Sequence, residues 1–379
     1  MRILLTSSRA PVTLELIRIL AEAGHEVHAS DTFAPTLGSH SHRLSRHHLT
    51  PSPRHASDEF GRALFDIITT NRIDWLIPTC EEVFHVGRHH KQLSAVTRVF
   101  GLPQAELDGW HNKFAFQQHA AGRGLFTPRT DLVRSSAELE TALVRYPRYL
   151  LKPAYSRFAA RIITNQGPCA GQCPLSSCRP SAAEPWLVQE FIEGESECCY
   201  SVVHEGRITA HCAYRTPHQV KGGAGSSFLS IPGEPTLAIA RRLLEGTNFT
   251  GQFSIDVLRT SDGRRCLLEC NPRATSAVHL LRPARLVEAL LNPGAPLWVE
   301  PPGRYQQLLF VVLAQNPFRL LANPPREWCR DVILSLRDPL PAFMQILQVG
   351  HLLAVARRCA IGLLEATTED IEWNGPSAP

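Results

Sequence analysis

GQFSIDVLRTSDGRRCLLECNPR, residues 251–273, is the stretch that decides the fold of the carboxyl-terminal half of this chain. Two runs rich in apolar residues flank the dipeptide Asp262-Gly263, which is the strongest short signal for a two-residue β-hairpin turn. Such a turn pairs Ser261 with Arg264 and so fixes the register of both strands. The stretch therefore predicts a tight antiparallel hairpin.

This register places three side chains with oxygen ligands on one face of the hairpin. Counting outward from the turn puts Asp256 directly opposite Glu269, and it pairs Asn271 with Ser254 on the same face. A loop of three residues would break this facing arrangement. The opposite face is expected to pack in the core, because it carries Phe253, Ile255, Val257, Cys266, Leu268 and Cys270.

Carboxylates that face each other repel unless a cation lies between them. One or two carboxylates, completed by water and phosphate oxygens, form the ligand set that Mg²⁺ prefers. We therefore interpret Asp256, Glu269 and Asn271 as a magnesium site. The alternative is an ion pair between Asp256 and Arg264 or Arg265 on a solvated face, but Glu269 and Asn271 belong to a hydrophobic strand, which favours the metal.

The first hundred residues alternate between strand-like and helix-like runs, which is typical of a parallel α/β unit. Residues 2–6, 26–31 and 74–79 read as buried strands, and the turn after the first strand lacks the GxGxxG of a dinucleotide site. Glu81 and Glu82 follow the third of these strands, at the edge where α/β folds place residues that contact ligands. They are either ligand contacts or a solvated pair.

An acid followed thirteen residues later by Glu-x-Asn-Pro-Arg resembles the ATP-grasp superfamily, especially carbamoyl phosphate synthetase and the carboxylate–amine ligases. The resemblance extends over about residues 1–295. It implies that Asp256, Glu269 and Asn271 hold one or two Mg²⁺ ions that bridge the phosphates of ATP, with Mn²⁺ as a substitute. Arg273 would then contact the transferred phosphate or the acyl phosphate.

Two lysines fall where the family places its ATP-contacting lysines. Lys113 stands in WHNKF, residues 110–114, at the start of an expected helix, and Lys152 ends the apolar strand YLLKP, residues 149–153. The resemblance implies that both contact ATP phosphates, Lys152 the α and β phosphates. Without the resemblance, Lys152 reads as an ordinary charge at the end of a strand.

The run LVQEFIEG, residues 187–194, resembles the hinge that binds adenine in this family. The resemblance implies that the backbone of Glu190 and Ile192 bonds the purine edge and that Glu195 or Glu197 binds the ribose hydroxyls. A strand that ends in a glycine turn is the alternative. The hinge itself comprises Gln189, Glu190, Phe191 and Ile192.

The segment after Lys152 departs from the family, which has a glycine-rich loop over the phosphates there. Residues 154–161 contain no glycine, and bulky residues hinder close approach of backbone N–H groups to phosphate. The hydroxyl of Ser156 and the guanidinium of Arg157 are the expected replacements, with Arg161 as a further cation. Lys221, which opens a glycine-rich run, is either a catalytic lysine at the acceptor site or part of an exposed hairpin loop.

The predicted fold class is α/β, with an N-terminal Rossmann-like pre-ATP-grasp domain, a two-lobed α+β ATP-grasp domain and a helical C-terminal extension. We place the pre-ATP-grasp domain at residues 1–105, the small lobe at 106–185, the large lobe with the metal site at 186–299 and the extension at 300–379. The extension either caps the substrate pocket or forms the interface of a homodimer. Ile371 and Trp373 indicate a docked terminus.

The composition excludes several partners. The formal charge is only +4 and no Lys/Arg block is present, so nucleic acid is not the expected partner. No apolar run is long enough for a membrane span, and Arg357 and Arg358 make residues 343–364 an amphipathic helix. Eleven cysteines without a secretory signal indicate reduced thiols and a cytoplasmic location.

The predicted function is a two-step ligation. A carboxylate attacks the γ-phosphorus of ATP to give an acyl phosphate and ADP, and an amine, a thiol or another nucleophile then displaces phosphate. The alternatives are a nucleotide-binding regulatory protein and a small-molecule kinase on the same fold. Both substrates are small molecules, but the sequence names neither the acid nor the nucleophile.

Overall fold

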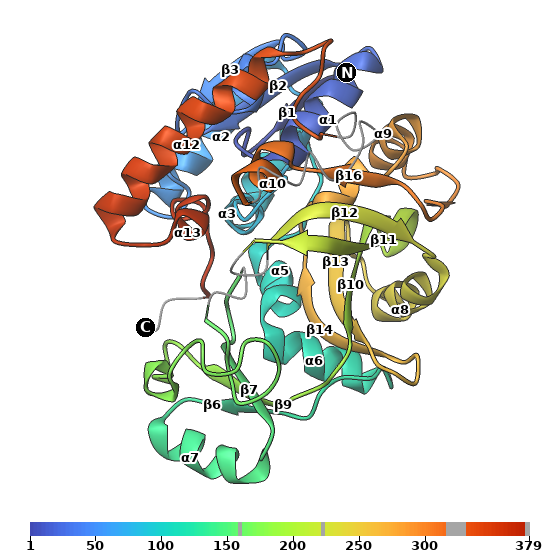
Figure 1. The fold of residues 1–379 in the computed structure, drawn as a ribbon. Helices are drawn as coiled ribbons and strands as arrows, with labels where there is room; N and C mark the ends of the chain where they lie inside the picture. The colour runs from blue at the N-terminus through green and yellow to red at the C-terminus, as the bar shows by residue number, and fades with distance from the viewer. Residues whose placement is uncertain (158–160, 221–223, 316–330, 376–379) are drawn as a thin grey trace.

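The computed structural model describes residues 1–157, 161–220, 224–315 and 331–375. Three sheets organise these residues (Figure 1). A parallel sheet forms the N-terminal body, a small sheet forms a lobe at the opposite end of the molecule, and a large antiparallel sheet lies beside both. The mixed α/β architecture predicted from the sequence is confirmed.

The N-terminal body is a five-stranded parallel sheet with the strand order β3-β2-β1-β4-β5. Its central strand is fully buried at Ile3, Leu4 and Leu5, as the uninterrupted apolar run predicts for a parallel sheet. The elements of this body are β1 (Arg2–Leu5), α1 (Pro11–Glu22), β2 (Glu26–Asp31), η1 (Gly38–His40), β3 (Arg46–Leu49), α2 (Ser57–Asn71), β4 (Trp75–Ile77), α3 (Val83–Arg88), α4 (His90–Leu93) and β5 (Arg98–Val99).

Two helices, α5 (Gln104–His111) and α6 (Lys113–Gly122), follow the N-terminal body. Asn112 separates them and caps α6, because its side chain accepts hydrogen bonds from the N–H groups of Phe114 and Ala115 at 3.0 and 3.1 Å. The cap fixes Lys113 as the first residue of α6, where the side chain is buried.

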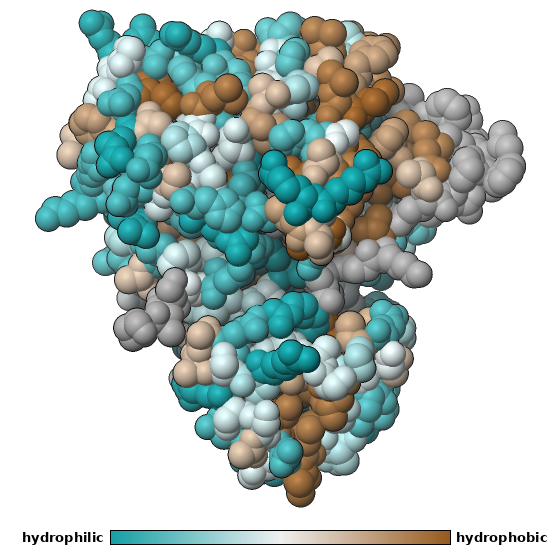
Figure 2. Space-filling model, turned by 90° about the vertical axis from the view of Figure 1, so that its left-hand side faces the viewer, coloured by the Kyte–Doolittle hydropathy of each residue, from teal (hydrophilic) through white to brown (hydrophobic). Residues whose placement is uncertain are grey.

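The small lobe comprises a four-stranded sheet of order β6-β9-β7-β8 and helix α7. It stands apart from the rest of the molecule as a separate projection (Figure 2). Strand β9 pairs with β6 and β7, so we propose that the boundary between the lobes lies after Glu190 rather than before Trp186. Its elements are β6 (Thr130–Val133), α7 (Ser136–Arg145), β7 (Tyr149–Pro153), β8 (Ile163–Thr164), η2 (Leu175–Ser177) and β9 (Trp186–Glu190).

The large sheet has the order β14-β13-β10-β11-β12-β16, and β15 pairs with β11. One face packs on α8 and α6 through a buried cluster that includes Phe253, Ile255 and Val257. Its elements are β10 (Glu195–His204), β11 (Arg207–Gln219), β12 (Gly225–Ile231), α8 (Glu234–Leu244), β13 (Gly251–Arg259), β14 (Arg265–Asn271), η3 (Ser276–His279), α9 (Pro283–Leu291), β15 (Trp298–Val299) and β16 (Tyr305–Gln307).

The β13–β14 hairpin confirms the predicted facing pair but not the predicted turn. The loop holds three residues, because Thr260 pairs with Arg264 through its N–H at 2.9 Å and Gly263 takes a positive φ of 82°. A β-bulge at Leu268 then shifts the register by one residue and restores the pairing of Asp256 with Glu269. Two deviations from a regular hairpin therefore cancel.

The bulge also changes which residue of β14 faces the core. Leu267 is fully buried in the cluster beneath the sheet, whereas Leu268 lines the cleft on the opposite side. The prediction that Leu268 packs in the core is wrong, since the two-residue alternation it relied on is broken at the bulge.

The C-terminal region contributes α10 (Leu309–Gln315), α12 (Leu340–Cys359) and α13 (Leu363–Ala366). Helix α12 lies along the N-terminal body (Figure 1), where the Gln348 side chain accepts from the N–H of Leu37 and donates to the carbonyl of Arg9. Within the described ranges, we find no helix with both the length and the apolarity that a bilayer crossing requires.

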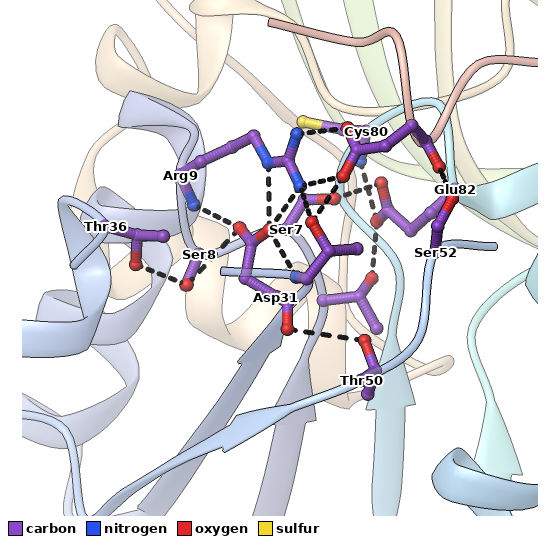
Figure 3. A network of polar contacts seen from close by, with 12 residues as sticks. Ser7, Ser8, Arg9, Asp31, Thr36, Thr50, Ser52, Cys80 and Glu82 are labelled. Carbon is purple, nitrogen blue, oxygen red and sulfur yellow. Dashed lines mark hydrogen bonds and ion pairs between the residues drawn. The ribbon is translucent and has the colours of Figure 1, made fainter. Parts of the chain in front are cut away.

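The residues after α13, 367–375, form a terminal tail that docks on the N-terminal body through Arg9. The buried Arg9 guanidinium binds Asp31 of β2 and also Asp370 of the tail, whose carboxylate lies 2.6 Å from Nη1. Figure 3 shows Arg9 reaching Asp31 within a wider polar network. Ile371 is buried beside it, so the docked terminus predicted from the sequence is confirmed.

We expect Arg9→Met to destabilise the protein by about 3 kcal/mol or more, because it leaves two carboxylates without their buried counter-ion. Urea unfolding followed by circular dichroism measures the change. Arg2→Met is the matched control, since Arg2 and its partner Glu26 are each nearly half exposed and should contribute less than about 1 kcal/mol. Equal effects of the two substitutions would refute this account.

Candidate active site

A cleft of about 410 Å³ lies between the small lobe and the large sheet. Its lining gathers residues from α6, β7, β9, β10, β11, β13 and β14. Eleven of the residues predicted from the sequence line it together: Lys113, Lys152, Ser156, Arg157, Gln189, Glu190, Ile192, Asp256, Glu269, Asn271 and Arg273. Lys221 lies outside the described residues.

Asp256 and Glu269 face each other across the two strands, and Asn271 donates from Nδ2 to Asp256 Oδ2 at 3.3 Å. Burial, followed by repulsion from Glu269, raises the pKa of Asp256. The neighbouring Glu269 is partly buried, its side chain being 25% exposed; desolvation opposes its ionisation, but Lys113 and Lys152 hold its pKa below the usual range. The two carboxylates lie close to the same two lysines and have an amide beside them. This arrangement fits the ligand set expected for Mg²⁺.

Lys113 supplies the nearest positive charge to this pair. Its Nζ lies 3.3 Å from Glu269 Oε2 and donates to the carbonyl of Ser156 at 2.5 Å. The side chain is only 4% exposed, so its attraction for Glu269 is weakly screened by solvent. Lys113 therefore joins the start of α6 to β14 and to the segment after β7.

Lys152 extends from the end of β7 toward the same carboxylates. Its Nζ donates to the carbonyl of Leu268 at 3.4 Å, and Gln117 of α6 donates to that carbonyl at 3.3 Å. Burial lowers the pKa of Lys152 to about 8, although Glu269 opposes the shift. The bulge at Leu268 thus presents a carbonyl that holds the second lysine in the cleft.

The hinge residues occupy the end of β9 and the turn after it. Gln189 donates to the Thr130 hydroxyl at 2.9 Å, and the Glu190 carboxylate binds Arg129 at 2.8 Å. Among the described residues, no hydrogen bond is made by the N–H of Ile192, which leaves this group at the cleft edge for a ligand. The N–H of Ile192 is thus available at the edge of the cleft, and its contact with adenine stays a prediction.

Phe191 does not line the cleft. Its side chain points to the surface of the small lobe, where the Arg148 guanidinium lies 5.7 Å from the ring centroid. Its N–H donates to the carbonyl of Arg148 at 3.0 Å. Phe191 lies between Glu190 and Ile192, which line the cleft, and since side chains alternate along an extended chain it faces away from the site.

The ribose role predicted for Glu195 or Glu197 is not supported by their positions. Neither lines the cleft; Glu195 pairs with Arg259, and the buried Glu197 pairs with Arg265 at 2.8 Å and Arg259 at 3.1 Å. Since side chains alternate along β10, Ser196 faces the cleft between them.

Arg273 and Arg157 converge on Glu81, which lies just after β4 in the N-terminal body. Arg273 Nε lies 2.7 Å from one carboxylate oxygen, and Arg157 Nε lies 3.3 Å from the other. Burial opposes ionisation of Glu81, but these two arginines hold its pKa far below the usual range. The solvated pair considered for Glu81 and Glu82 is therefore wrong, since both are 2% exposed.

Glu82 has a structural role instead. Its carboxylate accepts from the hydroxyls of Thr6 and Ser7 and from the N–H groups of Thr79 and Cys80. These contacts tie the ends of β1 and β4 together. Glu82 thereby fixes the turn that delivers Glu81 to the cleft.

The terminal tail reaches the same place and binds the other side of Arg157. Glu372 accepts from Arg157 Nη1 at 2.5 Å, and the carbonyl of Trp373 accepts from Nη2 at 2.7 Å. Arg157 is therefore held by Glu81 and by the tail, while Ser156 holds Lys113 through its carbonyl. The phosphate contacts predicted for Ser156 and Arg157 stay predictions.

The small number of lysines is a compositional signal that marks the site. The chain contains 39 lysines and arginines together, and only Lys91, Lys113, Lys152 and Lys221 are lysines. Two of these four are buried in the cleft. The ammonium group of lysine is a compact point charge, whereas the guanidinium group of arginine is planar and carries several donors. A buried lysine in an arginine-rich chain therefore indicates a position that favours a point charge.

The three-part architecture, with a cleft between two antiparallel lobes beside a parallel N-terminal body, is that of the ATP-grasp enzymes. An N5-carboxyaminoimidazole ribonucleotide synthetase solved with ADP superposes with a TM-score of 0.65 at 12% identity, over 84% of this chain and 85% of that one. At such low identity, the similarity shows the fold alone.

Two further solved structures have the same fold. The L-amino acid ligase from Bacillus licheniformis gives a TM-score of 0.54 at 14% identity, over 73% of this chain and 68% of that one. The biotin carboxylase domain of the Hydrogenobacter thermophilus 2-oxoglutarate carboxylase, solved with MgADP and bicarbonate, gives 0.60 at 12%, over 78% and 70%. Neither a family model nor a curated protein matches the sequence.

We expect Glu269→Gln to weaken binding of Mn²⁺, in the presence of ADP, at least tenfold, because one of two carboxylate ligands is lost. Electron paramagnetic resonance of free Mn²⁺ measures the bound fraction. Glu195→Gln is the control, since Glu195 is exposed and lies outside the cleft. Unchanged Mn²⁺ binding in Glu269→Gln would show that the metal assignment is wrong.

Lys152→Met should reduce the affinity for ATP roughly 10–100-fold, because a charged hydrogen-bond donor to phosphate contributes about 1.5–3 kcal/mol. Isothermal titration calorimetry with a non-hydrolysable ATP analogue measures the dissociation constant. Lys91→Met, an exposed position on α4, serves as the control. Equal affinities in the two variants would remove Lys152 from the nucleotide site.

Proposed function

We propose that this protein is an ATP- and Mg²⁺-dependent ligase that activates a carboxylate as an acyl phosphate for attack by an amine or another nucleophile. The observation that carries the proposal is the meeting of Lys113, Lys152 and Arg273 with the facing pair Asp256 and Glu269 in one cleft. Similar solved structures support it, since they are those of an amino acid ligase, a biotin carboxylase domain and a synthetase.

In the first step, a carboxylate oxygen of the substrate forms a bond to the γ-phosphorus, and the bond between that phosphorus and the ADP oxygen breaks. Lys113 and Lys152 bind the negative charge of the phosphates, and Arg273 holds the phosphoryl group that moves. Asp256, Glu269 and Asn271 would hold Mg²⁺, which would supply positive charge to neutralise the phosphate oxygens. This step needs no protein nucleophile, only positioned cations.

In the second step, the nucleophile attacks the acyl carbon, phosphate leaves, and the nucleophile loses its proton. The acyl phosphate must be protected from water until then. The small lobe stands opposite the large sheet across the cleft, so its closure would exclude water from the intermediate. Lys221, which lies outside the described residues, is proposed to assist this step.

One observation favours a regulatory, non-catalytic protein as the second candidate. Arg157, the proposed replacement for the glycine-rich phosphate loop, has its guanidinium held by Glu81 and by Glu372 of the tail. A phosphate would have to compete with both carboxylates for this group. A small-molecule kinase is the third candidate, and it differs by a stable phosphorylated product.

Hydroxylamine trapping separates these functions without knowledge of the natural nucleophile. The protein is incubated with MgATP, a pool of carboxylates and hydroxylamine, and hydroxamates are detected by mass spectrometry. A ligase gives a hydroxamate and stoichiometric ADP, and Arg273→Met should lower the rate at least a hundredfold because it removes a charge that binds the transferred group.

The other outcomes decide between the candidates. Release of ADP with a stable phosphorylated product and no hydroxamate would indicate a kinase. Tight ATP binding without ADP release from any carboxylate would favour the regulatory protein. The cytoplasmic location and the homodimer predicted from the sequence are part of this proposal and are tested by fractionation and by light scattering.

A further inference from the structure

A second cavity, of about 390 Å³, adjoins the cleft on the side of the N-terminal body and the C-terminal helices. Phe228, Arg273, Thr275 and Ser276 line both spaces. The two spaces therefore meet at Arg273, the residue proposed to hold the transferred phosphoryl group. An occupant of the second cavity has one end at the reacting centre.

The wall of this cavity is predominantly apolar. It is built from separate parts of the chain: α1, the loop before η1, the turn after β4, the large sheet with η3, and the C-terminal helices with the tail. The side chains that give it this character are Val12, Leu37, Phe228, Ile333, Val349 and Leu352. Binding of an aliphatic or aromatic group here is favourable, because the group is transferred from water to an apolar surface.

The charged groups in the described lining already have partners of opposite charge. Arg9 binds Asp31 and Asp370, Arg273 binds Glu81, and His279 Nδ1 lies 3.6 Å from Glu15. A phosphate ester inside the cavity would carry about two negative charges. Within the part of the chain that the structure describes, it would meet no cation that lacks a partner.

We propose that this cavity holds the body of the carboxylate substrate and that the substrate is a monocarboxylic acid with an aliphatic or aromatic body rather than a sugar phosphate. This inference rests on the proposed ligase function. The carboxylate lies at the Arg273 end, within reach of the nucleotide cleft, and the apolar body extends toward α12. The C-terminal region then serves as the cap over the substrate, which is one of the two roles expected for it.

The terminal tail and α13 form one wall of the cavity. Leu364, Thr368 and Ile371 line the cavity, and the tail is fixed by Asp370 on Arg9 and by Glu372 on Arg157. The same short segment thus bounds the substrate cavity and contacts Arg157, a residue of the nucleotide cleft. The wall is rigidly attached, so the length of acid that fits is limited.

A series of straight-chain acids tests the proposal: acetate, butyrate, hexanoate and octanoate, with phenylacetate and ribose 5-phosphate as further probes. Their binding to the full-length protein is measured by calorimetry with a non-hydrolysable ATP analogue and Mg²⁺, and ADP release is measured with ATP. We expect affinity to rise about fourfold per methylene until the cavity is full, and ribose 5-phosphate not to bind.

Val349→Trp places a larger side chain in the cavity and should weaken binding of octanoate at least tenfold. Leu353→Trp is the matched control, because Leu353 lies one turn away on the same helix, is 40% exposed and does not line the cavity. Affinity for the ATP analogue verifies that each variant is folded. If Val349→Trp fails to fold, Leu364→Trp with Leu363→Trp as control repeats the test from α13.

The inference and the proposed function fail in different ways. Three results would overturn the inference, even if some acid supports ADP release. The affinity could be independent of chain length, both cavity variants could still bind octanoate, or ribose 5-phosphate could bind better than the acids. Binding of octanoate that Val349→Trp abolishes, without ADP release from any acid, would support the cavity assignment and overturn the ligase function.

Discussion

Two carboxylates that face each other on adjacent strands constrain the rest of this protein. Asp256 and Glu269 are held together by the ladder between β13 and β14, and their repulsion must be offset by nearby positive charge. Lys113 from α6 and Lys152 from β7 supply that charge from two other parts of the chain. The groups that stabilise the carboxylates are also the ones proposed to bind the metal and the phosphates, so in this proposal stability and binding share one set of residues.

Glu81 is the corresponding point of contact for the N-terminal body. This buried carboxylate binds Arg273 from the large sheet and Arg157 from the small lobe, and Arg157 in turn binds the terminal tail through Glu372. Four parts of the chain therefore meet in one row of alternating charges. Removal of water strengthens such contacts, but each buried charge then depends on its neighbours. The placement of Arg157 is thus coupled to the docking of the tail.

The two spaces beside Arg273 differ in character because different elements line them. Strands of the two lobes surround the first with lysines and carboxylates, whereas helices of the N- and C-terminal regions surround the second with apolar side chains. A substrate that spans both must carry a charged reacting group and an apolar body. The polarity of the walls is the basis for the proposed chemical class of the substrate.

Local sequence patterns and the family resemblance predicted much of the fold and of the candidate site. The alternation of side chains along a strand placed Asp256, Glu269 and Asn271 on one face, and the resemblance to the ATP-grasp family placed Lys113, Lys152 and Gln189 at the same cleft. The parallel N-terminal sheet followed from buried strands separated by a helical stripe. These features depend on residues close in the sequence, where periodicity and turn chemistry act directly.

The tertiary structure decided what depends on contacts between distant residues. The loop of the hairpin holds three residues and the bulge at Leu268 compensates for it, and the carbonyl of Leu268 accepts from Lys152 and Gln117, which lie far away in the sequence. Glu197 faces away from the cleft because it pairs with Val257 of β13, whose side chain packs in the core, whereas its neighbour Cys198 pairs with Asp256. The burial of Glu81 and the docking of Asp370 on Arg9 join groups hundreds of residues apart, and no local pattern encodes a partner at that separation.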